Sequence, residues 1–420
     1  MKKSSYHWVW KWHFIGGLIS FPILFILAIT GIIYLFKDQY EEPRQVSIKK
    51  VQVNGDRLSY QEQWQIAKAH WNKKINSMVI PKEKDLATEF ISGRFSGKSS
   101  LYVHPYSGEV TGSVVVRGTD MFKVRKLHGE LLAGSVGTKI VELVGSWLIV
   151  LILSGLFLFF PKKKKDWNKL FRVRLHGPRH VLYRDLHMVG GFWFSIILLL
   201  IMAGGMPWTD VWGGGFKWVQ KQTGTGYPIT WQGKTLKSAL GVEPISLDQV
   251  ITYAQSLYLP GTTTVSLPHS AEGIFSIHNR YHLNLSKQVA IHIDQYSGQE
   301  IAALHWHDVG FLMRGRMWAM AFHQGQLGTW NWILVLFTAV GLLGLSTSAV
   351  IAFFLRKKPG TWGIPSGNSY RITAGFYVFV AIVSILLPLF GLSVILIMLL
   401  GFVNKLRVDK LRRSSAITQH

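Results

Sequence analysis

Two stretches of the sequence, WKWHFIGGLISFPILFILAITG (residues 10–31) and RDLHMVGGFWFSIILLLIMAGG (residues 184–205), follow one plan. The fourth residue of each is a histidine, His13 or His187, at the edge of a long apolar run, and Gly-Gly occupies the third and fourth positions after it. About 20 apolar residues are enough to cross the hydrocarbon core of a bilayer as an α-helix. We therefore expect two membrane helices that each carry an imidazole near one end.

The composition indicates membrane helices joined to aqueous domains. The chain is 48% hydrophobic and 13% aromatic with a mean hydropathy of +0.21, too apolar for an ordinary soluble enzyme and too polar for membrane helices alone. Its net charge of +24 lies largely beside apolar runs, which is typical of loops that set membrane topology and argues against a nucleic-acid partner. With no cysteine and 16 histidines, iron–sulfur clusters and c-type haem are excluded, and histidine becomes the main candidate ligand for a redox cofactor.

Five apolar segments are predicted to enter the membrane. They are residues 14–36, 138–160, 188–207, 331–355 and 372–403. The first is expected to be an uncleaved span within the segment 1–36, because no small-residue cleavage site follows it. The last has Pro388 and Gly391 near its middle and is either a kinked span or a hairpin. A hairpin is favoured because it returns the basic tail, residues 404–420, to the same side as the other basic loops.

Basic flanks set the predicted orientation of these spans. Lysines precede the first span, and the basic loops 161–187 and 356–371 follow the second and the fourth. The N-terminus and both loops are therefore placed in the cytoplasm. The segments 37–137 and 208–330 are expected on the outer side.

Each outer segment has the pattern of a small α+β domain. LSYQEQWQIAKAHW (58–71) and SLDQVITYAQSLY (246–258) have helical spacing, whereas LYVHPYSGEVTGSV (101–114) and VAIHIDQYSGQEIAAL (289–304) predict β-hairpins. In both hairpins Ser-Gly forms the turn, where glycine is free to adopt positive φ. The whole chain is thus an internal duplication of the order span, outer domain, span.

Four histidines occupy equivalent places in the two repeats. His13 and His187 lie near the cytoplasmic ends of the first and third spans, and His128 and His323 precede the second and fourth spans on the outer side. Two imidazoles at each end of a four-helix bundle can supply the axial nitrogens of two low-spin haems. Small residues beside them would let a porphyrin approach the backbone: Gly16, Gly17, Gly129, Gly190, Gly191 and Gly325. Single histidines at span ends are otherwise ordinary interfacial residues.

Other side chains are weaker candidates. His176 and His180 have metal-ligand spacing, but a solvated loop explains them better. His305 and His307 precede an interfacial stretch and are candidates for a substrate or propionate contact. Basic residues near the histidines could pair with haem propionates or anchor the interface: Lys11, Arg125, Lys126, Arg184, Arg314 and Arg316.

Four motifs together resemble the bacterial PepSY-associated transmembrane proteins, often called iron-regulated membrane proteins. They are WHFIGG…LAITGIIYLF (12–36), LHGELLAGSVG…VLILSGLFLFFPKKKK (127–165), RDLHMVGGFW (184–193) and FHQGQLGTW (322–330). The Y-S-G-E and Y-S-G-Q-E turns resemble the PepSY repeat, and the likeness extends from about residue 5 to 403. The resemblance implies an integral membrane α-helical bundle in the bacterial inner membrane. This bundle has four core spans, a C-terminal span or hairpin, and two periplasmic α+β PepSY-like domains.

The characterised branch of that family comprises dihaem ferric-siderophore reductases. The resemblance implies an enzyme that holds two haem b groups and passes electrons outward to a ferric siderophore or another ferric chelate. His13, His187, His128 and His323 would be the axial ligands. The electron donor, quinol or a cytoplasmic reductase, stays open. The alternative is a non-enzymatic PepSY-domain regulator that binds a periplasmic protein partner. A permease for iron chelates ranks third, because the spans carry little mid-membrane charge.

Overall fold

The structure is a computed structural model that describes residues 3–161, 163–357, 359–361 and 374–417. The chain forms two compact units, each assembled from separate stretches of sequence. The helical unit comprises Met1–Ile29, Gly129–Phe216 and Thr338–His420. The sheet unit comprises Thr30–His128 and Lys217–Phe337.

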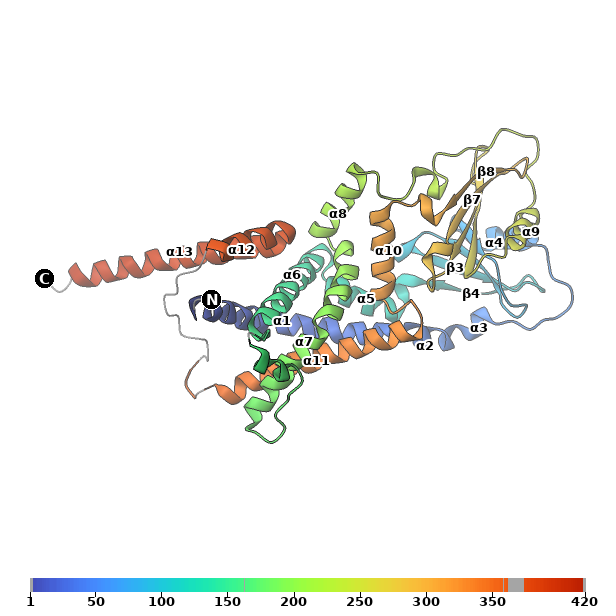
Figure 1. The fold of residues 1–420 in the computed structure, drawn as a ribbon. Helices are drawn as coiled ribbons and strands as arrows, with labels where there is room; N and C mark the ends of the chain where they lie inside the picture. The colour runs from blue at the N-terminus through green and yellow to red at the C-terminus, as the bar shows by residue number, and fades with distance from the viewer. Residues whose placement is uncertain (1–2, 162, 358, 362–373, 418–420) are drawn as a thin grey trace. The chain divides into compact units, whose positions relative to one another are not determined.

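Figure 1 labels the helices and several of the strands, which are numbered in chain order. The α-helices are α1 Lys3–Leu35, α2 Lys37–Glu41, α3 Val46–Lys49, α4 Tyr60–His70, α5 Asp120–Glu130, α6 Gly134–Phe159, α7 Arg179–Gly205, α8 Val211–Gln222, α9 Leu247–Ser256, α10 Phe311–His323, α11 Thr329–Arg356, α12 Ala374–Leu386 and α13 Pro388–Ile417. The strands are β1 Ser77–Val79, β2 Thr88–Ser92, β3 Ser99–Val103, β4 Val110–Val115, β5 Thr262–Ser266, β6 Ile274–Arg280, β7 Val289–Asp294 and β8 Glu300–His305.

Five helices of the described chain are long and apolar enough to cross a membrane. Their candidate spans are Tyr6–Leu35, Gly134–Phe159, Arg179–Trp208, Thr329–Arg356 and Pro388–Arg407. Helices α1 and α7 begin well before the predicted starts at residues 14 and 188. Hydropathy marks only the part of a helix that is apolar, whereas the backbone hydrogen bonds continue through the polar flank. Large apolar side chains on these helices are exposed, as expected of a surface that faces lipid.

Small residues let the helices of the helical unit approach closely. A Cβ on Gly16 would lie 2.7 Å from the ring of Trp147 on α6, and one on Gly190 would lie 2.7 Å from Leu345 on α11. Leu24, Leu148 and Leu198 form a buried cluster between α1, α6 and α7. Close packing around small residues is the usual source of helix association in lipid, where burial of apolar surface gives little driving force.

The apolar C-terminal segment forms two helices that pack side by side, α12 and α13 (Figure 1). The break falls at Leu387, because Pro388 has no N–H to continue the ladder of α12. Phe376, at the start of α12, contacts Trp8 of α1, whereas Phe390, at the start of α13, contacts Trp147. The chain turns back between the two helices, because a Cβ on Gly391 of α13 would lie 2.7 Å from the carbonyl oxygen of Ser384 on α12. Residues 372 and 373 of the predicted segment lie outside the described residues.

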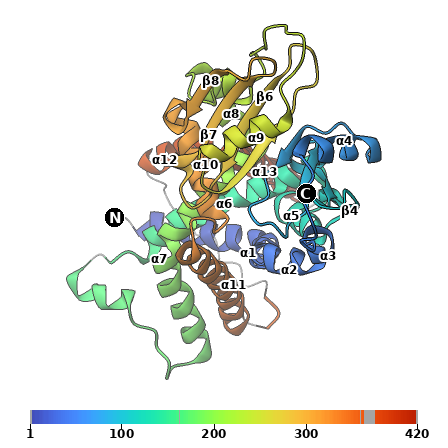
Figure 2. The ribbon, with the colours of Figure 1, turned by 90° about the vertical axis from the view of Figure 1, so that its right-hand side faces the viewer.

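The sheet unit contains a single eight-stranded antiparallel sheet in the order β4-β3-β2-β1-β5-β6-β7-β8 (Figure 2). The prediction of two separate outer domains needs correction here. The two repeats meet where β1 pairs with β5, with Met78 opposite Val265. Separate domains would each expose an unpaired strand edge, and pairing these edges satisfies their backbone groups.

Helices α4 and α9 cover one face of the sheet. The core between these helices and the sheet contains Met78, Phe90, Phe275 and Leu247, all at most 1% exposed. The predicted Ser-Gly turns are confirmed, because Gly108 and Gly298 connect β3 to β4 and β7 to β8 with φ of 77° and 68°. On the opposite face, β2 and β3 carry the polar side chains Glu89, Ser100 and Tyr102, which line a cavity, whereas Ala290 and Leu304 belong to a second apolar cluster.

Candidate functional site: two histidine pairs

The four predicted histidines form two pairs, one in each unit. In the helical unit, His13 on α1 and His187 on α7 have ring centroids 6.2 Å apart with an interplanar angle of 69°. In the sheet unit, His128 on α5 and His323 at the end of α10 have centroids 6.2 Å apart with an angle of 63°. The structure thus brings together the same partners that the repeat predicts. All four side chains are half-buried.

The spacing of both pairs fits two imidazoles on opposite sides of one iron. A metal–nitrogen bond of about 2.0–2.1 Å and a ring radius of about 1.1 Å place the centroids about 6.2–6.4 Å apart. A T-shaped contact between two rings without a metal also falls in this range. The centroid distance therefore supports an iron site only together with the contacts of the second nitrogen of each ring.

The Nδ1 atoms of the histidines are held by oxygens of neighbouring helices. His13 Nδ1 lies 2.9 Å from Ser154 Oγ, and this hydroxyl donates to the Leu151 carbonyl at 3.1 Å. His187 Nδ1 lies 3.0 Å from the Leu345 carbonyl oxygen. Because a carbonyl oxygen only accepts, His187 donates from Nδ1 and keeps a lone pair on Nε2. His13 does the same when the Ser154 hydroxyl is directed to the Leu151 carbonyl. Metal-bound histidines typically donate their second ring N–H in this way, so that Nε2 becomes the ligand.

A hydroxyl residue followed by glycine faces a histidine in each unit. His128 Nδ1 lies 3.1 Å from Thr30 Oγ1, and a Cβ on Gly31 would lie 3.4 Å from the His128 ring. Ser154 and Gly155 repeat this arrangement around His13, with 3.1 Å between a Gly155 Cβ and the ring. Sequence reasoning missed Thr30 and Ser154, although the motifs ITG and LSG near span ends were a usable signal.

The predicted small residues fall into two groups. Gly16 and Gly190 are needed for helix packing, because a Cβ there would clash with Trp147 or Leu345. By contrast, nothing lies within 4 Å of a Cβ built on Gly129 or Gly191. Among the described residues, these two positions are therefore not required for helix packing. Gly325 adopts φ of 69° after α10, so its role is conformational.

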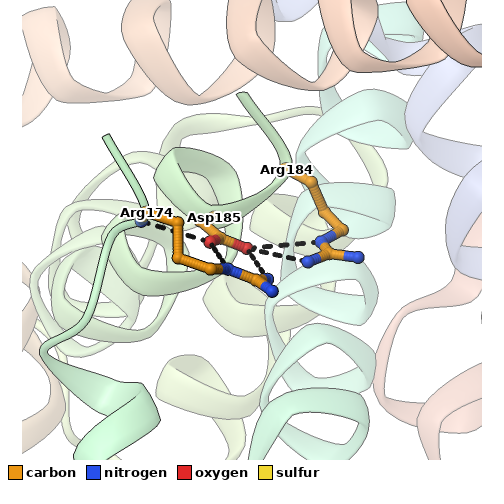
Figure 3. Close-up of polar contacts among 3 residues, drawn as sticks. All are labelled: Arg174, Arg184 and Asp185. Atoms are coloured by element: carbon orange, nitrogen blue, oxygen red, sulfur yellow. Dashed lines mark hydrogen bonds and ion pairs between the residues drawn. The ribbon is translucent and has the colours of Figure 1, made fainter. Parts of the chain in front are cut away.

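A charged cluster fixes the start of α7 next to His187 (Figure 3). The Arg174 guanidinium donates to both oxygens of Asp185 at 2.7 and 2.9 Å, and Arg184 donates to one of them at 3.1 Å. Asp185 is only 6% exposed. The cluster ties the basic loop to the helix, and it engages Arg184, one of the predicted partners of a propionate.

The remaining predicted residues have diverse surroundings. Arg125 Nη2 donates to Ser96 Oγ at 3.1 Å, and Arg314 Nη1 donates to the His307 carbonyl at 3.2 Å. The structure also places Lys126 on α5 over the ring of Phe122, Arg316 buried on α10, and Lys11 on α1 two residues before His13.

The weaker histidine candidates do not form a metal centre in the described part of the chain. There, no three His, Asp or Glu side chains converge on a common point, and His176 and His180 are exposed. His305 and His307 stack with centroids 5.5 Å apart and line a shallow cavity of about 440 Å³. A pair of histidines alone suits an iron that takes its other four nitrogens from a porphyrin.

The comparisons with known proteins agree with this membrane architecture. The family described as PepSY-associated TM region matches residues 10–357, nearly the whole chain. No curated protein matches the chain. The family match confirms the resemblance read from the histidine motifs.

Proposed function

We propose that this chain, which belongs to the family with a PepSY-associated TM region, is a dihaem b-type membrane protein that reduces ferric chelates. His13 and His187 would ligate one haem, and His128 and His323 the other. The observation that carries the proposal is the pair of His–His contacts at 6.2 Å, together with the Nδ1 contacts that leave Nε2 for a metal. When bound, each haem would supply an iron that gains and loses one electron at a time.

Neighbouring side chains and backbone groups would hold the histidine rings in place as ligands of the haem iron. Ser154 and the Leu345 carbonyl hold the rings of His13 and His187 in one tautomer and orientation. Thr30 holds His128. A haem held by two histidines would be suited to electron transfer and not to binding oxygen or substrate directly.

The surroundings of His13 support a cytoplasmic location for the N-terminus. Arg356, at the end of α11, lies over the rings of Trp10 and Phe14 at 5.3 and 5.8 Å. Tryptophan and arginine together are typical of a membrane interface, and basic residues favour the cytoplasmic side. We place the protein in the bacterial inner membrane, with the segments 37–137 and 208–330 in the periplasm. Quinol or a cytoplasmic reductase would supply electrons at the His13 side.

The proposed substrate follows from the chemistry of iron release. Siderophores and other ferric chelates hold Fe(III) through hard oxygen donors. Fe(II) prefers softer ligands, so it binds these oxygen donors more weakly than Fe(III) does. One electron delivered at the His128 side would therefore release iron from the chelate. No protein nucleophile or general acid is required.

A second function, a regulator that binds a periplasmic protein, is favoured by one feature of the sheet unit. Leu240 and Val242 are 75% and 99% exposed in the loop before α9. An exposed apolar loop is a usual element of a protein interface. This alternative leaves the paired histidines without a role.

The first test is the dithionite-reduced minus air-oxidised visible spectrum of the full chain in detergent, with haem counted as its pyridine derivative. We expect sharp low-spin b-type bands and about two haems per chain. His13→Ala and His187→Ala should each remove one and the same haem, whereas His128→Ala and His323→Ala should remove the other. Double variants within a pair should lose no more than single ones, and His180→Ala should keep both haems.

A folded protein that shows no haem bands when prepared with ample haem would refute the proposal and leave the regulator as the leading function. Loss of both haems from a single variant would refute the assignment of independent pairs.

A further inference from the structure

The sheet unit contains a cavity of about 390 Å³ that the histidine pairs do not use. Its walls come from residues 34–49, from strands β2 to β4 and from helix α5. Along β2 and β3, Glu89, Ser100 and Tyr102 face this side, while Phe90 and Leu101 face the apolar core. The volume is at the small end of the range for ligand pockets, about 300–1,000 Å³, so a compact ligand would fill it.

Charged side chains surround the cavity, and several are already neutralised by each other. Lys98 Nζ lies 2.7 Å from Glu89, and Lys37 Nζ lies 3.3 Å from Asp38. Glu41, another wall residue, accepts the backbone N–H of Met121 at 3.2 Å and the side-chain amide of Gln45 at 3.3 Å.

Two cations remain available to a ligand. Among the described residues, neither Lys49 nor Arg125 has a carboxylate partner. The Arg125 guanidinium lies 5.0 Å from the centre of the Phe122 ring and donates to Ser96 Oγ at 3.1 Å. A guanidinium and an ammonium that line one cavity favour an anion that exposes carboxylate or similar oxygens.

The cavity wall begins one helical turn from the His128 imidazole. Arg125 precedes His128 by three residues on α5, a rise of about 4.5 Å. Tyr34, another wall residue, follows Thr30 by four residues on α1, and Thr30 contacts His128 Nδ1 at 3.1 Å. Two separate helices therefore connect the cavity with the same imidazole.

We propose that this cavity binds a compact anionic ferric chelate that exposes carboxylate oxygens, held by Lys49 and Arg125 beside the His128–His323 pair. The inference rests on the proposed function and adds the docking place and the charge class of the substrate. One electron would leave the ferrous iron held by His128 and His323, making it ferric, and enter the chelated Fe(III), making it Fe(II). Quinol or a cytoplasmic reductase would then replace this electron. The transfer to the chelated Fe(III) moves no proton and breaks no covalent bond.

Binding is tested apart from electron transfer with Ga(III)–EDTA, which has the charge and shape of Fe(III)–EDTA but cannot be reduced. Calorimetric titration of the full chain in detergent should show one site. Lys49→Gln with Arg125→Gln should weaken binding at least tenfold, and Val114→Trp, which fills the cavity from β4, should abolish it. The matched control, Lys68→Gln with Arg117→Gln, removes the same charges outside the cavity and should bind as the wild type does.

A second measurement follows the rate at which Fe(III)–EDTA oxidises the dithionite-reduced protein. This rate should fall at least tenfold in the Lys49/Arg125 variant, while the haem content and spectrum stay unchanged. Equal binding by this variant and the control, or no binding by the wild type, would overturn the inference. Loss of a haem from Arg125→Gln would also overturn it, because Arg125 would then serve a propionate. Ga(III)–EDTA binding by a protein that holds no haem would instead contradict the proposed function and leave the anion site standing.

Discussion

Removing the hydroxyl group of Thr30 gives a sharp test of how the protein positions His128. Thr30→Val keeps the volume of this side chain, which is 4% exposed, and deletes the oxygen 3.1 Å from His128 Nδ1. Loss of such a partner typically costs 10–100-fold in affinity for the bound metal. Because 3.1 Å is at the long end of hydrogen-bond distances, we expect the lower end, about tenfold or about 1.4 kcal/mol.

The assay is a titration of haem-depleted protein with haem, followed by a redox titration of each haem. As an iron ligand through Nε2, His128 would donate from Nδ1 to Thr30 Oγ1. Without this acceptor the imidazole is less basic and stabilises Fe(III) less, so the haem at His128 should bind more weakly and its midpoint potential should rise. The haem at His13 should be unchanged.

General loss of stability is controlled by Thr88→Val. Thr88 is fully buried and donates to Gln63 Oε1 at 2.6 Å, so its removal also breaks a buried hydrogen bond. We expect this variant to lose about 1–3 kcal/mol of stability and to keep both haems with wild-type potentials. Thr30→Val that retained wild-type affinity and potential would refute the positioning role.

Three further predictions concern stability and are checked by unfolding the full chain in detergent. Gly16→Ala should destabilise the helices by about 1–3 kcal/mol relative to Gly17→Ala. The reason is that a Cβ on Gly16 would lie 2.7 Å from Trp147, whereas one on Gly17 would lie 3.9 Å from its nearest neighbour. Equal stabilities of the two variants would contradict this packing. Burial, with the nearby His292, lowers the pKa of His278 to about 4 from 6.5, so the unfolded chain binds more protons between these values. Stability should therefore fall by at most about 3 kcal/mol as the pH drops from 6.5 to 4, and His278→Gln should reduce this dependence. Glu142→Ala should lower the free energy of unfolding by about 1.5–3 kcal/mol, because this buried carboxylate accepts the first N–H groups of α8 at 2.8 and 2.9 Å. An unchanged unfolding midpoint would exclude that role.

The sequence by itself determined the membrane segments, the internal repeat and the residues of both histidine pairs. These features depend on local chemistry: about 20 apolar residues fit one bilayer, and a repeated motif places the same side chain at the same point of two equivalent helices. The Ser-Gly turns were predictable for a similar reason, since glycine alone adopts their positive φ at no cost. The family followed from the same motifs.

Only the tertiary structure decided features that depend on contacts between distant segments. The pairing of β1 with β5, with Met78 opposite Val265, joins the two repeats into one sheet, and nothing local to either strand states its partner. Thr30 and Ser154 become partners of His128 and His13 across 98 and 141 residues of sequence. The cavity near Arg125 likewise depends on where three separate segments meet. Edge pairing, hydrogen bonding and concave shape are properties of the assembled backbone, and a linear pattern of residue types does not contain them.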